Sequence, residues 1–148
     1  IAYSGHMYLP EVINRVMSSG LKWYWIGSCL HGHSNEKATL SQVFEVNMFA
    51  KQKPILFLYK NKKNKQLNWT EDVFISLSDD KGFHEWGQSL NPFDRIIKTF
   101  EPKIVCDPFL GGATTAIACL MNKVKFIGAE IDEQSYNISK KRIDEYGK

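Results

Sequence analysis

The stretch "KIVCDPFLGGATTAIACLMNKVKFIGAEID" (residues 103–132) decides the fold of this chain. The apolar run Ile104–Asp107 is typical of a buried strand and breaks at an acid and a proline. Two glycines then predict a tight turn, and the apolar spacing over Thr114–Asn122 predicts a helix. A second apolar run, Lys125–Ile131, predicts a second strand. Strands that alternate with helices in this way indicate a parallel sheet with crossover helices.

The predicted turn has the chemistry of a nucleoside site. It lies at the carboxyl edge of a parallel sheet, where open α/β sheets bind ligands. Gly111 and Gly112 leave room for a ligand and can adopt a positive φ, while Thr114 or Thr115 can cap the helix. Glu130 ends the next strand, where a carboxylate can accept both hydroxyls of a ribose and would repel a 2′-phosphate. The alternative is a tight connection with two permissive glycines and a solvent-facing acid.

The residues around the turn favour one nucleoside cofactor. The pyrophosphate fingerprint G-x-G-x-x-G is absent from this segment, which argues against NAD. The strand ends instead in Asp107-Pro108-Phe109, and an acid at that point would oppose a diphosphate but suit a cation. These features favour S-adenosylmethionine, which carries an amino group and a sulfonium.

The first part of the chain predicts a smaller set of elements. The sequence predicts the end of a strand, a turn, and a helix that runs from Leu9 to a stop at Gly20. An aromatic-rich strand follows over 21–30, and we expect Trp23, Tyr24 and Trp25 to pack into the core. One of these three aromatic residues lining a base pocket is the alternative.

The middle of the chain is harder to interpret. The run 43–60 predicts a strand or strand pair interrupted near 51–54, with Pro54 at the start of the second strand. Residues 61–91 have little periodicity and predict a long surface excursion. After it, the sequence predicts a helix over 91–100 with Asn91 as its N-cap, and a last helix over Glu133–Tyr146.

Length and composition set the broad class. The chain has 148 residues, 43% of them hydrophobic and 24% charged, which suits one globular domain. No apolar run approaches the ~20 residues of a membrane span, and we expect no signal peptide. We expect its three cysteines to be reduced in a cytoplasmic protein. A net charge of +3 permits nucleic-acid binding without arguing for it.

Two motifs carry a family resemblance. "DPFLGGATTAIA" and "FIGAEIDEQSYNISKKRI" closely resemble the cofactor half of the DNA methyltransferases that methylate adenine N6 or cytosine N4. Their order resembles the permuted (β-type) group, and "HEWGQSLNPFDRIIKTF" resembles the segment that wraps the methionine end of the cofactor. "AYSGHMYLPEV" and "KPILFLYK" resemble stretches of phage and prophage members. The resemblance is specific over residues 84–143 and looser over 1–60.

This resemblance implies roles for individual residues. Asp107 and Phe109 would border the cofactor, Glu130 would take the ribose hydroxyls, and Asp132 or Ile131 would lie near the adenine. Residues 88 and 89 would flank the methionine carboxylate, although many members have lysine where this chain has serine. The implied cofactor-binding residues are Asp107, Phe109, Gly111, Gly112, Thr114, Glu130, Asp132, Gln88 and Ser89.

The catalytic tetrapeptide of the family, Asp/Asn/Ser-Pro-Pro-aromatic, is absent. In the family two of its acceptors bind the amino hydrogens of the flipped base and the aromatic residue stacks on it. All five prolines of this chain are isolated, so it contains no Pro-Pro pair, and we name no catalytic residue. The motif would precede Ile1, so the sequence is either a piece of a normal enzyme or a degenerate homologue. Ala113 replaces a second family glycine.

Two further clusters have a functional and a plain interpretation. Cys29, His31 and His33 alternate and would suit zinc, but a fourth ligand is lacking and a polar loop is the simpler hypothesis. A lysine-rich loop would contact DNA phosphates or form a solvated turn. Its basic residues are Lys60, Lys62, Lys63 and Lys65.

The sequence therefore predicts an α/β, Rossmann-like S-adenosylmethionine-dependent methyltransferase fold, incomplete at its N-terminal strands. We expect one partial domain over 1–148, with 61–90 as a loop for DNA contact and 91–148 as the cofactor-binding half. The expected function is site-specific methylation of double-stranded DNA in a restriction-modification or phage setting, with no membrane. The alternative is an inactive remnant that binds the cofactor or DNA. Exposed apolar strand edges would favour self-association.

Overall fold

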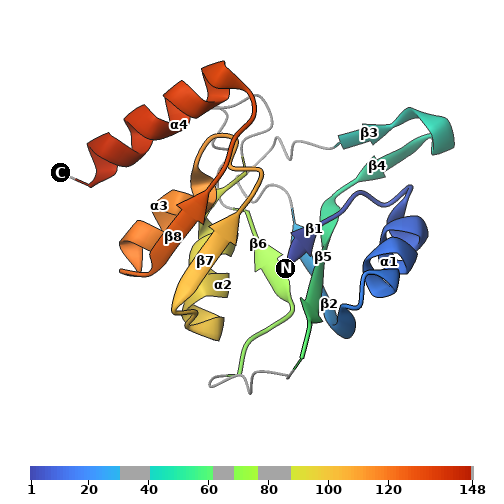
Figure 1. Cartoon of the computed structure of the whole chain (residues 1–148). Helices are drawn as coiled ribbons and strands as arrows, with labels where there is room; N and C mark the ends of the chain where they lie inside the picture. The colour runs from blue at the N-terminus through green and yellow to red at the C-terminus, as the bar shows by residue number, and fades with distance from the viewer. Residues whose placement is uncertain (31–40, 62–68, 77–87, 148) are drawn as a thin grey trace. The chain divides into compact units, whose positions relative to one another are not determined.

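The computed structural model describes residues 1–30, 41–61, 69–76 and 88–147 (Figure 1). Its contacts divide the chain into two compact units, Ile1–Ile75 and Ser76–Lys148, called here the first and the second unit. Each unit is described by itself. The single domain expected over 1–148 stays a prediction.

The first unit is built around a four-stranded sheet of order β1-β5-β2-β6. The unit also contains helix α1 and a small hairpin of strands β3 and β4 (Figure 1). A short 3₁₀ turn joins β3 to β4. The elements are β1 (Ala2–Tyr3), α1 (Leu9–Ser18), β2 (Lys22–Leu30), β3 (Ser41–Val43), β4 (Met48–Ala50), β5 (Gln52–Tyr59) and β6 (Val73–Ile75). The helix and the aromatic strand confirm the sequence-based elements, and the predicted loop over 31–41 lies almost entirely outside the described residues.

Strand β5 is the centre of the first unit. It runs antiparallel to both β1 and β2, and β6 pairs in parallel with β2. Ile55, Leu56 and Phe57 are buried, so the strand is a continuous apolar run. Pro54 is the third residue of β5 rather than its first. It is tolerated there because the ladder with β1 covers only Ile55 and Leu56.

Two features of this unit differ from the sequence-based expectations. Strand β6 lies inside residues 61–91, for which the sequence predicts a long surface excursion. The Trp23 and Trp25 side chains are exposed rather than packed in the core. A β-bulge at this point of the β2–β5 pairing breaks the alternation, and the Trp25 indole donates to the Asp72 carboxylate at 3.0 Å.

The second unit has the strand–helix–strand order that the sequence predicts. Strands β7 and β8 pair in parallel, with Ile104 opposite Lys125 and Asp107 opposite Gly128. Val105 and Phe126 pack against a core cluster formed by residues of α2 and α3. The elements are α2 (Leu90–Phe100), β7 (Ile104–Asp107), α3 (Thr114–Met121), β8 (Lys125–Gly128) and α4 (Glu133–Tyr146). Over the described ranges, no helix is long and apolar enough to cross a membrane.

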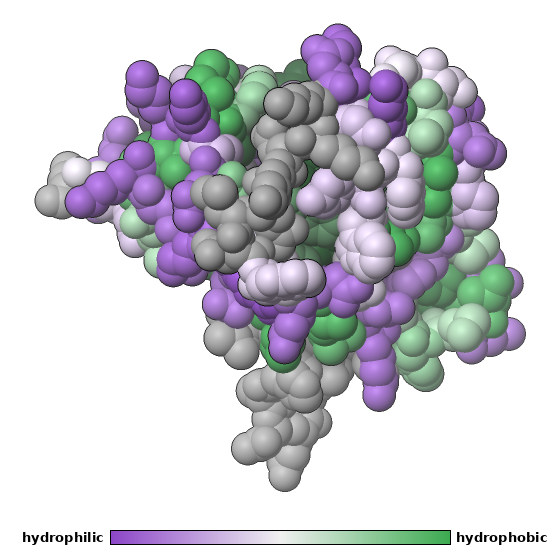
Figure 2. Space-filling model, turned by 90° about the horizontal axis from the view of Figure 1, so that it is seen from below, coloured by the Kyte–Doolittle hydropathy of each residue, from purple (hydrophilic) through white to green (hydrophobic). Residues whose placement is uncertain are grey.

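Some boundaries in the second unit shift from those expected. Helix α2 begins at Leu90, and its N-cap is Ser89 instead of Asn91, two residues earlier than expected. Strand β8 ends at Gly128 rather than Ile131. Ile104 and Ile127 are more than half exposed. Apolar residues also reach the surface in several places on the face in Figure 2. Self-association through such surfaces stays a prediction.

Candidate functional site

The turn after β7 is tied to the end of β8 by backbone hydrogen bonds. The Leu110 amide donates to the Ala129 carbonyl at 2.9 Å, and the Ala129 amide donates to the Asp107 carbonyl at 3.0 Å. The Asp107 carboxylate also accepts the Phe109 amide at 3.0 Å. The parallel pairing thus continues past both strands and brings Asp107 and the start of the turn beside the segment that carries Glu130.

The Glu130 carboxylate forms hydrogen bonds with the backbone of the turn, which the alternative of a merely solvent-facing acid does not include. Its two carboxylate oxygens accept backbone amides, from Gly111 at 2.7 Å and from Asp132 at 3.0 Å. The hydrogen bonds from the Asp132 and Gly111 amides hold the pKa of the Glu130 carboxyl below its usual value. The carboxylate is therefore ionised near neutral pH, and each oxygen keeps acceptor capacity for a ligand hydroxyl.

The turn needs two left-handed residues. Gly111 has φ +51°, as its glycine allows, but the second left-handed residue is Ala113, at φ +64°. A non-glycine residue in this region costs about 1–2 kcal/mol. The family motif has glycine where this chain has Ala113. This chain therefore pays a conformational penalty at Ala113 to form the turn.

The cap of α3 differs from the prediction. The N-cap residue is Ala113, with no side-chain hydrogen bond to the helix, and Thr114 is the first helical residue. The expected cap by Thr114 or Thr115 is therefore wrong. The Thr114 hydroxyl donates instead to the Gln88 carbonyl at 3.4 Å. This contact brings the segment before α2 beside the turn, with Ser89 buried next to it.

Two apolar side chains stand out at the same edge. Phe109 is 86% exposed and Ile131 is fully exposed, although both are large and hydrophobic. They flank the acids Asp107 and Glu130 in sequence and are available to a flat apolar ligand group. Asp132 has a structural task, because its carboxylate caps α4 by accepting the Ser135 amide at 2.8 Å.

One residue near the turn was missed by the sequence analysis. The Arg142 guanidinium, on α4, donates to the Gly112 carbonyl. The neighbouring Ile143 packs against the core cluster of Leu110, Ala113 and Ala116. The signal available in the sequence was an arginine next to an isoleucine in a largely polar helix. Periodicity alone does not say that this side chain reaches a carbonyl thirty residues earlier.

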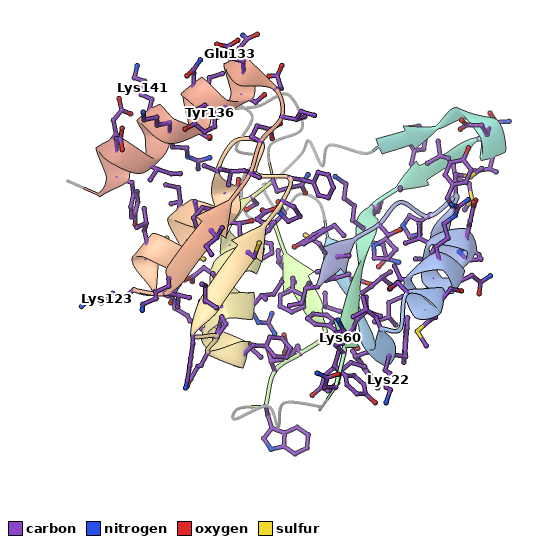
Figure 3. The ribbon with its side chains drawn as sticks, viewed as in Figure 1. Lys22, Lys60, Lys123, Glu133, Tyr136 and Lys141 are labelled. Atoms are coloured by element: carbon purple, nitrogen blue, oxygen red, sulfur yellow. The ribbon has the colours of Figure 1, made fainter. Side chains whose placement is uncertain are left out.

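The lysine cluster can be placed only in part. Lys60 is exposed and follows β5, whose last residue, Tyr59, pairs with Lys22 at the amino end of β2. Figure 3 shows Lys22 and Lys60 near the same end of the sheet. This is the edge opposite to the carboxyl ends of β2 and β6. Lys62, Lys63 and Lys65 lie outside the described residues, so DNA contact by these lysines stays a prediction.

The described residues do not support the zinc alternative. Cys29 is buried, and that burial raises the pKa of its thiol, which disfavours the thiolate that binds metal. His31 and His33 lie outside the described residues. Within the described parts of the chain, no three His, Cys, Asp or Glu side chains are arranged to hold a metal ion.

Comparison with known proteins decides the family. The family model described as DNA methylase, of the N6/N4 type, matches residues 21–141. The chain belongs to this N6/N4 DNA methylase family. The match includes β7, the turn, β8 and most of α4, so the carboxylate-held turn lies inside the family's own sequence pattern.

A curated relative and solved structures agree with membership of the N6/N4 DNA methylase family. The type II methyltransferase M.HindIII of Haemophilus influenzae is 40% identical over 68 residues, which are 45% of this chain and 22% of that protein. The M1.HpyAVI–SAM complex has a TM-score of 0.73 at 21% identity, covering 95% of this chain and 71% of that one. TTHA0409 of Thermus thermophilus, complexed with S-adenosyl-L-methionine, has a TM-score of 0.66 at 15% identity, covering 95% and 61%. These structures establish the methyltransferase-like α/β fold.

Proposed function

We propose that this chain carries the cofactor-binding part of an S-adenosylmethionine-dependent DNA methyltransferase that acts on an exocyclic amino group, adenine N6 or cytosine N4. The observation that carries the proposal is the Glu130 carboxylate, which bonds the Gly111 amide across the turn between β7 and α3. This arrangement lies within the sequence matched by the N6/N4 DNA methylase family.

The residues of the second unit fit the parts of this cofactor. The ionised Glu130 has acceptor capacity for ribose hydroxyls, and the exposed Phe109 and Ile131 offer apolar surface for an adenine. Asp107, at the end of β7, supplies negative charge suited to an amino group and a sulfonium. When bound, S-adenosylmethionine would supply an electrophilic methyl group. Gly111, Gly112, Thr114, Gln88, Ser89 and Asp132 complete the proposed set.

The acid at the end of β7 argues against a dinucleotide. A pyrophosphate at this turn would meet the Asp107 carboxylate, and the segment lacks the glycine fingerprint that binds pyrophosphate. Both the acid and the missing fingerprint favour S-adenosylmethionine over NAD.

Methyl transfer needs groups beyond this site. An exocyclic amino nitrogen is a poor nucleophile until acceptors bind its hydrogens, and the chain has no Pro-Pro motif to supply them. We therefore propose that this chain alone binds the cofactor without transferring the methyl group. The proposed partner of the whole protein is double-stranded DNA.

Calorimetric titration with S-adenosylmethionine, S-adenosylhomocysteine and NAD tests the proposal. We expect the two methionine compounds to bind and NAD not to bind. Glu130→Ala should abolish binding, whereas Glu133→Ala, in the exposed first turn of α4, should leave it unchanged. Binding of NAD alone, or of none of the three, would refute the proposed function.

A transfer assay with methyl-labelled cofactor and duplex DNA tests whether this chain alone transfers the methyl group. We expect no label in the DNA with this chain alone. Labelled N6-methyladenine or N4-methylcytosine would show that the chain is catalytically complete, and the proposal of a binding part alone would be wrong.

A further inference from the structure

A charged side chain attaches helix α4 to the turn between β7 and α3. The Arg142 guanidinium donates to the Gly112 carbonyl. On the same helix, Ser139 is buried and Ile143 packs against Leu110 and Ala113. Arg142 is itself partly buried, so this hydrogen bond is only partly open to competition from water.

The contact fixes the orientation of one peptide group. Gly112 contributes the carbonyl of this group, which accepts from Arg142, and Ala113 contributes the amide, which donates to the Leu110 carbonyl at 3.0 Å. Because a trans peptide is planar, with its C=O and N–H pointing in opposite directions, two partners on opposite sides hold the plane. The plane in turn sets the φ of Ala113.

This peptide is the part of the turn that most needs to be held. Ala113 has φ +64°, in the left-handed region that favours glycine. One residue away from the peptide, the Gly111 amide donates to Glu130. Glu130 therefore holds the turn at the Gly111 amide, and Arg142 holds it at the Gly112 carbonyl. The left-handed Ala113 follows directly after Gly112.

We propose that Arg142 is a positioning residue for the cofactor turn, which compensates for the left-handed alanine at position 113. The proposal rests on the proposed function, because the property that Arg142 supports is the binding of S-adenosylmethionine. Without the guanidinium, the Gly112 carbonyl loses a partner and Ala113 relaxes toward a right-handed or extended conformation. That relaxation moves the Gly111 amide away from Glu130. With glycine at position 113, the left-handed conformation persists without help.

Four proteins test this dependence: the unmodified chain, Arg142→Ala, Ala113→Gly and the double variant. Calorimetric titration with S-adenosylmethionine measures the affinity of each, and circular dichroism verifies that the helices are retained. We expect Arg142→Ala to weaken binding about tenfold, the size of one lost charge-assisted hydrogen bond. In the Ala113→Gly background the same substitution should cost about threefold or less.

Two further variants serve as a matched control and as a conservative substitution. Lys141→Ala is the matched control, because the Lys141 side chain on α4 (Figure 3) is 78% exposed. Its amino group lies 3.9 Å from the Glu145 carboxylate. The Lys141→Ala variant should bind like the unmodified chain. Arg142→Lys keeps a cation with a single donating centre and should fall between the unmodified chain and Arg142→Ala. It also provides a measurement if Arg142→Ala fails to fold.

The outcomes separate this proposal from the proposed function. If the unmodified chain does not bind S-adenosylmethionine, the proposed function fails and this proposal fails with it. If it binds and Arg142→Ala binds equally well, only the positioning role is refuted. An equal loss in the alanine and glycine backgrounds would show that Arg142 merely anchors α4, which also refutes the proposal.

Discussion

The two units use their side chains in different ways. In the first unit, β5 is buried by neighbouring strands and holds its place through apolar contact, with Ile55 and Leu56 fully buried. In the second unit, β7 and β8 each leave an isoleucine more than half exposed, and acidic and basic side chains hold the backbone of a turn. The first unit thus depends on burial of a strand, whereas the second combines a small helical core with polar contacts that shape a site.

The largest effect should come from the central strand of the first unit. Leu56→Ala removes fully buried methyl groups and should lower the free energy of unfolding by about 2–5 kcal/mol. Ile127→Ala, in the exposed strand of the second unit, should cost less than about 1 kcal/mol. Urea unfolding followed by tryptophan fluorescence and circular dichroism measures both. Equal losses would remove the contrast between the units.

The next effect concerns the approach of β6 to β2. A Cβ at Gly27 would lie 2.7 Å from the backbone carbonyl oxygen of Asp72, so Gly27→Ala forces strands apart and should cost about 1–3 kcal/mol. Gly5→Ala is the control, because a Cβ at Gly5 meets nothing within 4 Å. Urea midpoints of the two variants give the comparison. A Gly27→Ala midpoint equal to that of the control would show that β6 is not closely packed.

The cap of α4 should give a smaller effect in the second unit. Asp132→Ala removes the acceptor of the Ser135 amide and should cost about 1 kcal/mol. Asp144→Ala, in the last turn of the same helix, should be neutral or slightly stabilising, since it removes a negative charge from the negative end of the helix dipole. Helical circular dichroism against temperature measures both variants. An unchanged midpoint for Asp132→Ala would contradict the polar support described for this unit.

The smallest effect, and the most specific, is the pH dependence of Glu130. Its pKa is lowered in the folded chain, so its contribution to stability is present above the ordinary glutamate pKa of about 4.3 and is lost as pH falls through the lower folded value. Glu130→Gln should therefore be less stable than the unmodified chain at pH 7, by less than Asp132→Ala. The difference should shrink by pH 3. Glu133→Gln serves as the control, and a pH-independent gap would contradict the carboxylate's role.

Local sequence predicted much of the second unit. The bounds of β7 and α4 agree with those expected, because each is marked by neighbouring residues: Asp107-Pro108 ends the strand, and Asp132 caps the helix. Gly111 was correctly expected to allow a positive φ. The cap of α3 was wrong, since the Thr114 hydroxyl faces a carbonyl of a distant segment instead of its own helix. The cofactor and DNA roles of individual residues stay predictions.

Sequence reasoning was weaker where partners are far apart in the chain. Strand β6 has three residues and exists through its parallel pairing with β2, so its own composition is a weak signal. The exposure of Trp23 and Trp25 follows from a bulge and from the contact with Asp72, neither of which a run of aromatic residues reveals.

The sequence by itself determined the order of strands and helices around residues 103–132, the family, and the acid that follows the second strand. These properties are carried by residues next to one another in the chain. Only the tertiary structure decided that Glu130 bonds the Gly111 amide and that Arg142 bonds the Gly112 carbonyl. It also showed that the second left-handed residue of the turn is Ala113. The physical reason is that a hydrogen bond depends on where a backbone group points, and that direction is set only when strand, turn and helix pack together.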